Sequence, residues 1–121
     1  MTLKPVLAHL VLFVLGSAVA ADDAAIKAVE ARANGNSWTF SVTLEHNDTG
    51  WDDYADGWRI VTEDGTELGL RVLFHPHVNE QPFTRSLSDV SIPDRVTRVF
   101  VEARTLVDGW GAERFSVDLP N

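Results

Sequence analysis

An alternation of apolar and polar residues with a period of two constrains this chain more than any other feature of its sequence. In SWTFSVTLEH, from Ser37 to His46, Trp, Phe, Val and Leu stand at every second position, with Ser, Thr or Glu between them. Because successive side chains of a strand point to opposite faces of a sheet, this pattern predicts strands with one buried face. It predicts seven strands, at residues 25–33, 38–46, 58–62, 68–74, 83–92, 96–106 and 115–119.

For three of these segments the sequence supports more specific predictions. Residues 25–33 are rich in alanine, which leaves a short helix as the alternative to a first edge strand. In residues 83–92 the apolar positions change phase, which predicts a bulge. In residues 68–74 the alternation assigns four residues to the apolar face: Leu68, Leu70, Val72 and Phe74.

Turn signals separate the predicted strands at regular intervals. The Asp-Gly pair within residues 63–66, EDGT, is a strong hairpin signal. Residues 92–95 form a proline turn, and residues 33–37 and 108–113 are glycine-containing loops. Short strands joined by such turns predict an all-β fold, a single immunoglobulin-like antiparallel β-sandwich of about seven strands.

The segment PFTRSLSDVSIPDRVTRVFVEARTLVDGWGAERFSVDLP resembles the last three strands of fibronectin type III domains. There an apolar strand leads through a proline turn into a V-x-V-x-A strand, and a glycine loop precedes the final strand. The tyrosine usual in that family's long strand is absent here. Through its DGW, HPHV and EQPFTRS segments, the chain also resembles small uncharacterised secreted proteins of Gram-negative bacteria. That resemblance implies a location outside the cytoplasm and no particular activity.

The first twenty residues have the pattern of a signal peptide. Lys4 precedes an apolar run, and Ala18 and Ala20 occupy the small-residue positions of an A-x-A cleavage site. We therefore expect a signal peptide at 1–20, a domain at 21–121 and a periplasmic or secreted location, with an uncleaved anchor as the alternative. No cysteine follows the apolar run, so we expect no lipid anchor. The sequence contains no second apolar run, so we expect no membrane insertion after cleavage.

The charge of the chain narrows the class of its partners. Removing residues 1–20 removes one basic residue, Lys4, and leaves 9 basic and 18 acidic residues, a net charge of −9. Such a domain repels phosphate backbones and anionic membrane surfaces, and it favours cations and basic partners. We therefore expect a protein or small-ligand partner and no nucleic acid.

Strand order predicts which loops lie together. If every connection reverses direction, the loops at residues 46–57, 75–82 and 107–113 gather at one end of the sandwich. The three histidines of the predicted domain and most acidic loop residues fall at this end, which we call the loop end. Because functional groups concentrate on loops held by a rigid scaffold, the loop end is the predicted binding end.

Histidines with nearby carboxylates predict a metal site at the loop end. Imidazole is a common ligand of Zn²⁺ and Cu²⁺. The candidate ligands are His46, His75, His77 and Glu80. In the alternative interpretation His46 bonds a loop carbonyl, and His75 and His77 face solvent. A looser Ca²⁺ site is a weaker hypothesis for the aspartates of residues 46–57: Asp48, Asp52, Asp53 and Asp56.

Tryptophans in the loops predict a second kind of site. A platform for a sugar or peptide would comprise Trp51, Asp52, Asp53 and Trp110. The alternative is that the loop tryptophans cover the open end of the sandwich. No G-x-S-x-G, H-E-x-x-H or cysteine nucleophile is present, so we predict no enzyme. The predicted function is a non-enzymatic binding module, and the alternative is a periplasmic Cu²⁺ or Zn²⁺ binding protein.

Overall fold

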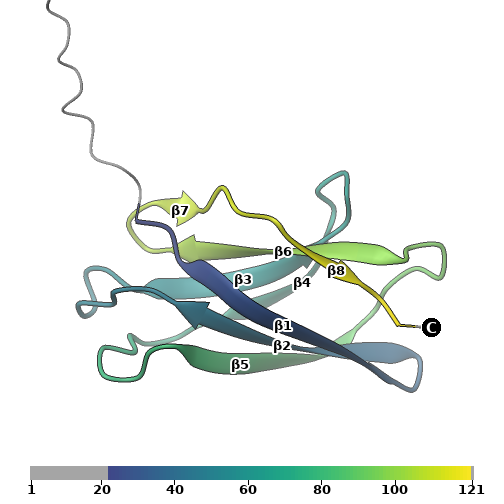
Figure 1. The fold of residues 1–121 in the computed structure, drawn as a ribbon, viewed down its shortest axis with the longest axis horizontal. Helices are drawn as coiled ribbons and strands as arrows, with labels where there is room; N and C mark the ends of the chain where they lie inside the picture. The colour runs from purple at the N-terminus through teal and green to yellow at the C-terminus, as the bar shows by residue number, and fades with distance from the viewer. Residues whose placement is uncertain (1–21, 121) are drawn as a thin grey trace, which may run out of the picture.

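The computed structural model describes residues 22–120, which form two antiparallel sheets packed face to face (Figure 1). The predicted signal peptide at residues 1–20 lies outside the described residues. Eight strands are formed in the part described: β1 (Ala25–Asn34), β2 (Ser37–Glu45), β3 (Ala55–Val61), β4 (Glu67–Val72), β5 (Phe83–Val90), β6 (Arg98–Thr105), β7 (Gly109–Trp110) and β8 (Phe115–Asp118). No helix long and apolar enough to cross a membrane occurs between residues 22 and 120.

One sheet has the order β1-β2-β5, and the other contains β4, β3, β6, β7 and β8. In the second sheet β3 lies between β4 and β6, and both β7 and β8 pair with β6. Every pairing is antiparallel. The predicted all-β, two-sheet, sandwich-like arrangement is therefore confirmed.

The helix alternative for residues 25–33 is wrong, because Ala25–Asn34 is a strand that pairs along β2. The two strands form a hairpin whose turn contains Gly35 at a φ of +65°, a conformation that glycine adopts without steric cost. Strand β7 was not predicted. It contains only two residues, which is too short for a period of two to be visible.

The core lies between the sheets and contains most of the residues that the alternation assigned to it, with Leu70, Val72 and Phe74 as the exceptions. Phe40, Val42 and Leu44 of β2 are almost completely buried. They belong to the same apolar cluster as the second sheet's inward residues, which include Trp58, Ile60, Val99 and Val101. Burying one such side chain contributes roughly 1.5–3 kcal/mol, so this cluster supplies the main stabilisation of a domain without disulfides.

The predicted apolar face of residues 68–74 is confirmed at Leu68, which packs against the core, but is wrong in phase from Leu70 onward. Gly69 and Arg71 pair with the inward residues Ile60 and Trp58, so the residues between them point outward. Leu70 is partly exposed, and Phe74, beyond the strand, is 73% exposed. The cause is packing across the sandwich, since a Cβ on Gly69 would lie 3.0 Å from Leu87 Cδ2. No room therefore exists for a larger side chain at position 69 on this inward face.

The bulge predicted in residues 83–92 is confirmed. Trp38 pairs with Val90 and Phe40 pairs with Leu87, so three steps along β5 oppose two steps along β2. Asp89, within this irregularity, has a φ of +62°. The extra residue changes the phase of the apolar positions, which is why the alternation broke there.

The three predicted loops lie together at one end, on the left in Figure 1. The Leu106 amide donates to the Tyr54 carbonyl, which joins the β6–β7 turn to the β2–β3 loop. The His77 amide donates to Asp48, which joins the loop before β5 to the β2–β3 loop. Asp22 also lies at this end, where its amide donates to the Asp108 carboxylate. The loop end is therefore a contiguous surface of four segments.

Candidate functional site

Asp48 holds the loop end together. This buried carboxylate accepts hydrogen bonds from the Ala55 amide (3.0 Å) and His46 Nδ1 (2.7 Å) at one oxygen, and from the His77 amide (2.8 Å) at the other. A carboxylate removed from water is costly unless donors surround it, and here both of its oxygens are bonded. Asp48 therefore fixes the His46 ring and two loops at once.

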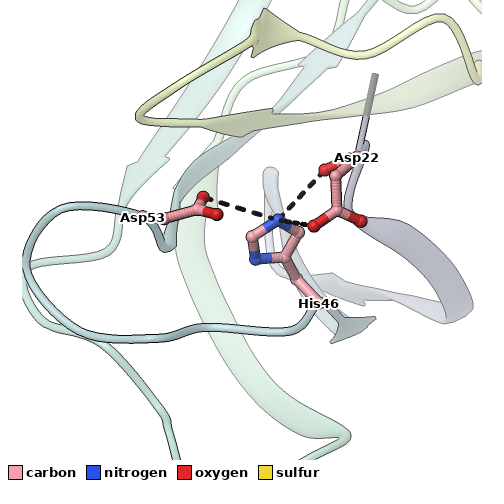
Figure 2. A group of neighbouring side chains, drawn as sticks. All are labelled: Asp22, His46 and Asp53. Carbon is pink, nitrogen blue, oxygen red and sulfur yellow. Dashed lines mark hydrogen bonds and ion pairs between the residues drawn. The ribbon is translucent and has the colours of Figure 1, made fainter. Parts of the chain in front are cut away.

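His46 continues the inward phase of β2, as its position after Leu44 indicated, and its side chain is 0% exposed. Figure 2 shows its Nε2 pointing toward Asp22 and Asp53. The distances from Nε2 are 3.0 Å to the Asp22 carbonyl, 3.4 Å to Asp22 Oδ2 and 3.8 Å to Asp53 Oδ1. One ligand atom from each of the three residues lies within 4.8 Å of the other two.

The groups around His46 favour a positive charge on its ring. Burial lowers the pKa of His46, but the hydrogen bond to Asp48 and the negative charges of Asp22, Asp48 and Asp53 outweigh it, so the pKa is raised. Both ring nitrogens face oxygen acceptors. The Nε2 position therefore suits a proton or another cation.

His77 has a different environment. Its ring is buried and stacks on Phe83 at 3.9 Å between centroids, and its Nε2 lies 2.9 Å from Arg85 Nη2. Burial and the Arg85 charge lower the pKa of His77. Because a guanidinium can only donate, Nε2 accepts and the ring is neutral. Its Nδ1 is buried and has no hydrogen-bond partner among residues 22–120.

The other two predicted ligands lie near His77. His75 is exposed, and its ring centroid is 4.7 Å from that of His77. Glu80 is also exposed, and its Oε1 lies 3.2 Å from Arg85 Nη2. Arg85 thus stands between His77 and Glu80, where a shared metal ion would need to be.

The structure therefore does not bring His46, His75, His77 and Glu80 to one point. His46 Nε2 faces Asp22 and Asp53, whereas His77 Nε2 faces Arg85. Within residues 22–120, the group of three with converging ligand atoms is Asp22, His46 and Asp53. Of the four aspartates considered for Ca²⁺, only Asp53 belongs to it. Asp48 is engaged by backbone amides and His46, and Asp56 pairs with Arg104 at 2.9 Å.

Trp51 is the most prominent aromatic residue of the loop end. It is 66% exposed and contacts Tyr54 edge to face, with ring centroids 5.8 Å apart. An open pocket of about 570 Å³ lies between Trp51 and the loop before β5. Its lining comprises Gly50, Trp51, His75, Pro76, His77, Val78, Asn79 and Glu80. Asp52 is exposed beside Trp51.

Trp110 does not line this pocket. It lies in β7, half-buried, with the Arg59 guanidinium 3.9 Å and the Arg104 guanidinium 5.1 Å from its ring centroid. Arg59 also forms an ion pair with Glu102 at 2.8 Å. These contacts occupy the Trp110 ring on the outer face of the second sheet, separately from the Trp51 pocket.

Sequence reasoning missed Asp22 and the true role of Asp48. The spacing of Asp48 two residues after an inward histidine is a signal that could have been noticed. Asp22 had no such signal, since it reaches His46 only through the folded packing of β1 beside β2.

Comparison with known proteins yields one informative similarity. No protein-family model matches the chain, and no solved structure matches it. The chain is 42% identical over 86 residues to a protein of Halomicrobium mukohataei described as a "Putative lipoprotein". The matched region covers 71% of this chain and 42% of the relative. The chain therefore spans less than half the length of that relative.

Proposed function

We propose that this protein is a non-enzymatic binding module that works outside the cytoplasm and engages its partner through the loop end. The observation that carries the proposal is the exposed Trp51 beside an open pocket of about 570 Å³. Tryptophan offers a large contact area on a rigid side chain, and its exposure costs free energy that a partner could recover.

The scaffold suits this role. Strands β1, β2 and β5 share one sheet, and β4, β3, β6 and β8 share the other, a grouping that supports a fibronectin type III-like, and hence immunoglobulin-like, sandwich. Asp48 bonds the β2–β3 loop to the loop before β5, so the two walls of the pocket are held in fixed relation. A pre-organised pocket loses less conformational entropy when it binds.

The location rests on two observations. The first twenty residues have the composition of a signal peptide. The similar protein of Halomicrobium mukohataei is described as a "Putative lipoprotein", and lipoproteins are found outside the cytoplasm. Both support a periplasmic or secreted protein. The mass of the exported chain tests this, since cleavage before Ala21 would leave 101 residues.

The character of the partner follows from the lining of the pocket. Trp51, Pro76 and Val78 supply apolar surface, while the chain's net charge of −8 favours positively charged groups. We expect a protein segment or small ligand that combines an apolar part with a basic group, and no nucleic acid. We propose no catalytic role for the buried histidines: His46 bonds the Asp48 carboxylate and the Asp22 carbonyl, and His77 bonds the Arg85 guanidinium.

A peptide array and a glycan array, each probed with the labelled protein, test the proposal. Ligands that bind the wild type should be lost with Trp51→Ala. They should be retained with Phe74→Ala, which removes an equally exposed aromatic residue that does not line the pocket. Ligands that survive Trp51→Ala, or are lost equally with Phe74→Ala, would contradict binding at this pocket.

A further inference from the structure

We propose that Asp22, His46 and Asp53 form a binding site for a divalent transition-metal ion such as Zn²⁺, with Asp48 as the positioning residue behind the imidazole. This site is separate from the Trp51 pocket and does not depend on the binding role proposed for it. Its members differ from the predicted set, since they share only His46 with it.

The spacing of the ligand atoms suits one small ion. Ligands of a tetrahedral zinc ion with bonds of about 2.0–2.1 Å lie about 3.3–3.4 Å apart. His46 Nε2 lies 3.4 Å from Asp22 Oδ2 and 3.8 Å from Asp53 Oδ1. The ligand atoms of Asp22, His46 and Asp53 all lie within 4.8 Å of one another, so a shared ion would draw the two carboxylates slightly inward. The Asp22 carbonyl, 3.0 Å from Nε2, offers a further oxygen.

Asp48 supplies the support that a metal-binding histidine requires. Its Oδ1 accepts from His46 Nδ1 at 2.7 Å, which assigns a proton to Nδ1, so a metal ion would bind at Nε2 in place of the proton that Nε2 shares with the Asp22 carbonyl. Asp48 cannot rotate away, because the Ala55 and His77 amides hold its two oxygens. The imidazole is thus oriented before any ion arrives.

Solvent can reach the site from the side of the carboxylates. The His46 side chain is fully buried, whereas the Asp22 and Asp53 side chains are 61% and 30% exposed. A buried, oriented nitrogen donor beneath two accessible carboxylates is more than a group of surface acids. One imidazole with carboxylate oxygens is a mixed donor set that favours Zn²⁺ and its first-row neighbours over Ca²⁺, which prefers oxygen alone.

Calorimetric titration of the chelator-treated, exported protein with ZnCl₂ is the first test. We expect one ion per chain. Asp53→Asn should weaken binding about tenfold or more, since it removes a ligand charge from a side chain that faces His46 Nε2 at 3.8 Å. The matched control is Asp52→Asn, which removes the same charge from the adjacent exposed residue. It should change the dissociation constant by less than about threefold.

Two further variants test whether Asp48 acts by positioning His46 without affecting the fold, and whether His75 and His77 take part in binding. Asp48→Asn should weaken Zn²⁺ binding by about 10- to 100-fold while circular dichroism still shows a folded sandwich. A double His75→Ala, His77→Ala variant should bind as the wild type does. On Zn²⁺ addition, the ¹⁵N resonance of His46 Nε2 should shift strongly and those of the other imidazoles should not.

Three outcomes would overturn the site. One is the absence of saturable one-to-one Zn²⁺ binding. Another is an equal loss of affinity in Asp52→Asn and Asp53→Asn, which would show a general effect of charge. The third is a loss of binding in the double histidine variant, which would place the ion at His75 and His77.

Discussion

The buried carboxylate of Asp48 accepts a hydrogen bond of 2.8 Å from the backbone amide of His77, 29 residues further along the chain. This bond joins the β2–β3 loop to the loop before β5, and the same side chain orients His46. The rim of the Trp51 pocket and the group around His46 therefore share one positioning residue. A substitution of Asp48 should therefore alter both the rim of the Trp51 pocket and the position of the His46 ring.

Asp48→Asn should destabilise the domain by about 2–3 kcal/mol, because the amide group of asparagine would face a backbone or ring donor and leave it unpaired in the interior. Asp52→Asn should change the free energy of unfolding by less than about 0.5 kcal/mol, since Asp52 is exposed. Urea unfolding of both variants measures the difference. Equal stability of the two would show that Asp48 is not the link between the loops.

The orientation of β4 can be tested by a pair of substitutions. Gly69→Val should cost about 1–3 kcal/mol, because the new Cβ would lie 3.0 Å from Leu87 Cδ2 and 3.3 Å from Val90 Cγ2. Leu70→Ala should cost less than about 1 kcal/mol, since Leu70 points outward. Thermal or urea unfolding distinguishes them. If Leu70→Ala were the costlier change, the apolar face of β4 would lie inward after all.

Acid–base titration should separate the two buried histidines of the loop end. In metal-free protein the pKa of His46 should lie above its usual value and that of His77 below it. The stability contributed by His46 is then fully present below about pH 6.5 and is lost as the pH rises through the folded pKa. The stability contributed by His77 depends on pH in the opposite direction. It is present above about pH 6.5 and is lost as the pH falls through its folded pKa.

NMR titration of the imidazole resonances measures both pKa values. Unfolding of His46→Gln and His77→Gln at several pH values checks the sign of each effect. For His46→Gln the loss of stability relative to wild type should shrink as the solution becomes alkaline. A reversed order of the two pKa values would contradict the hydrogen-bond assignments around both rings.

The tryptophans should differ in their accessibility to a small quencher. Trp51 is 66% exposed, whereas Trp58 is completely buried. Trp51→Phe should therefore remove most of the acrylamide-quenchable emission and leave stability nearly unchanged. Trp58→Phe should leave the quenchable emission in place and destabilise the core by roughly 1–3 kcal/mol through lost packing. Emission from Trp51 that resists acrylamide would mean that the pocket beside it is covered.

The sequence by itself determined the strands and most of the core. The alternation that placed Phe40, Val42 and Leu44 inward also placed His46 on the same phase, and the structure confirms it. The shared end of the loops followed as well, since an antiparallel sandwich reverses direction at each connection. These features are local or topological, so residues close together in the chain are enough to predict them.

Only the tertiary structure decided which groups meet. Asp22 reaches His46 across 24 residues because β1 pairs with β2, and Arg85 separates His77 from Glu80 because it projects from β5 beside them. The phase of β4 was set by the space that Leu87 leaves opposite Gly69. Alternation records which residues are apolar but not how much room the opposite sheet leaves. The ligand set around His46 depends on contacts between segments distant in the chain, and those exist only once the sandwich has closed.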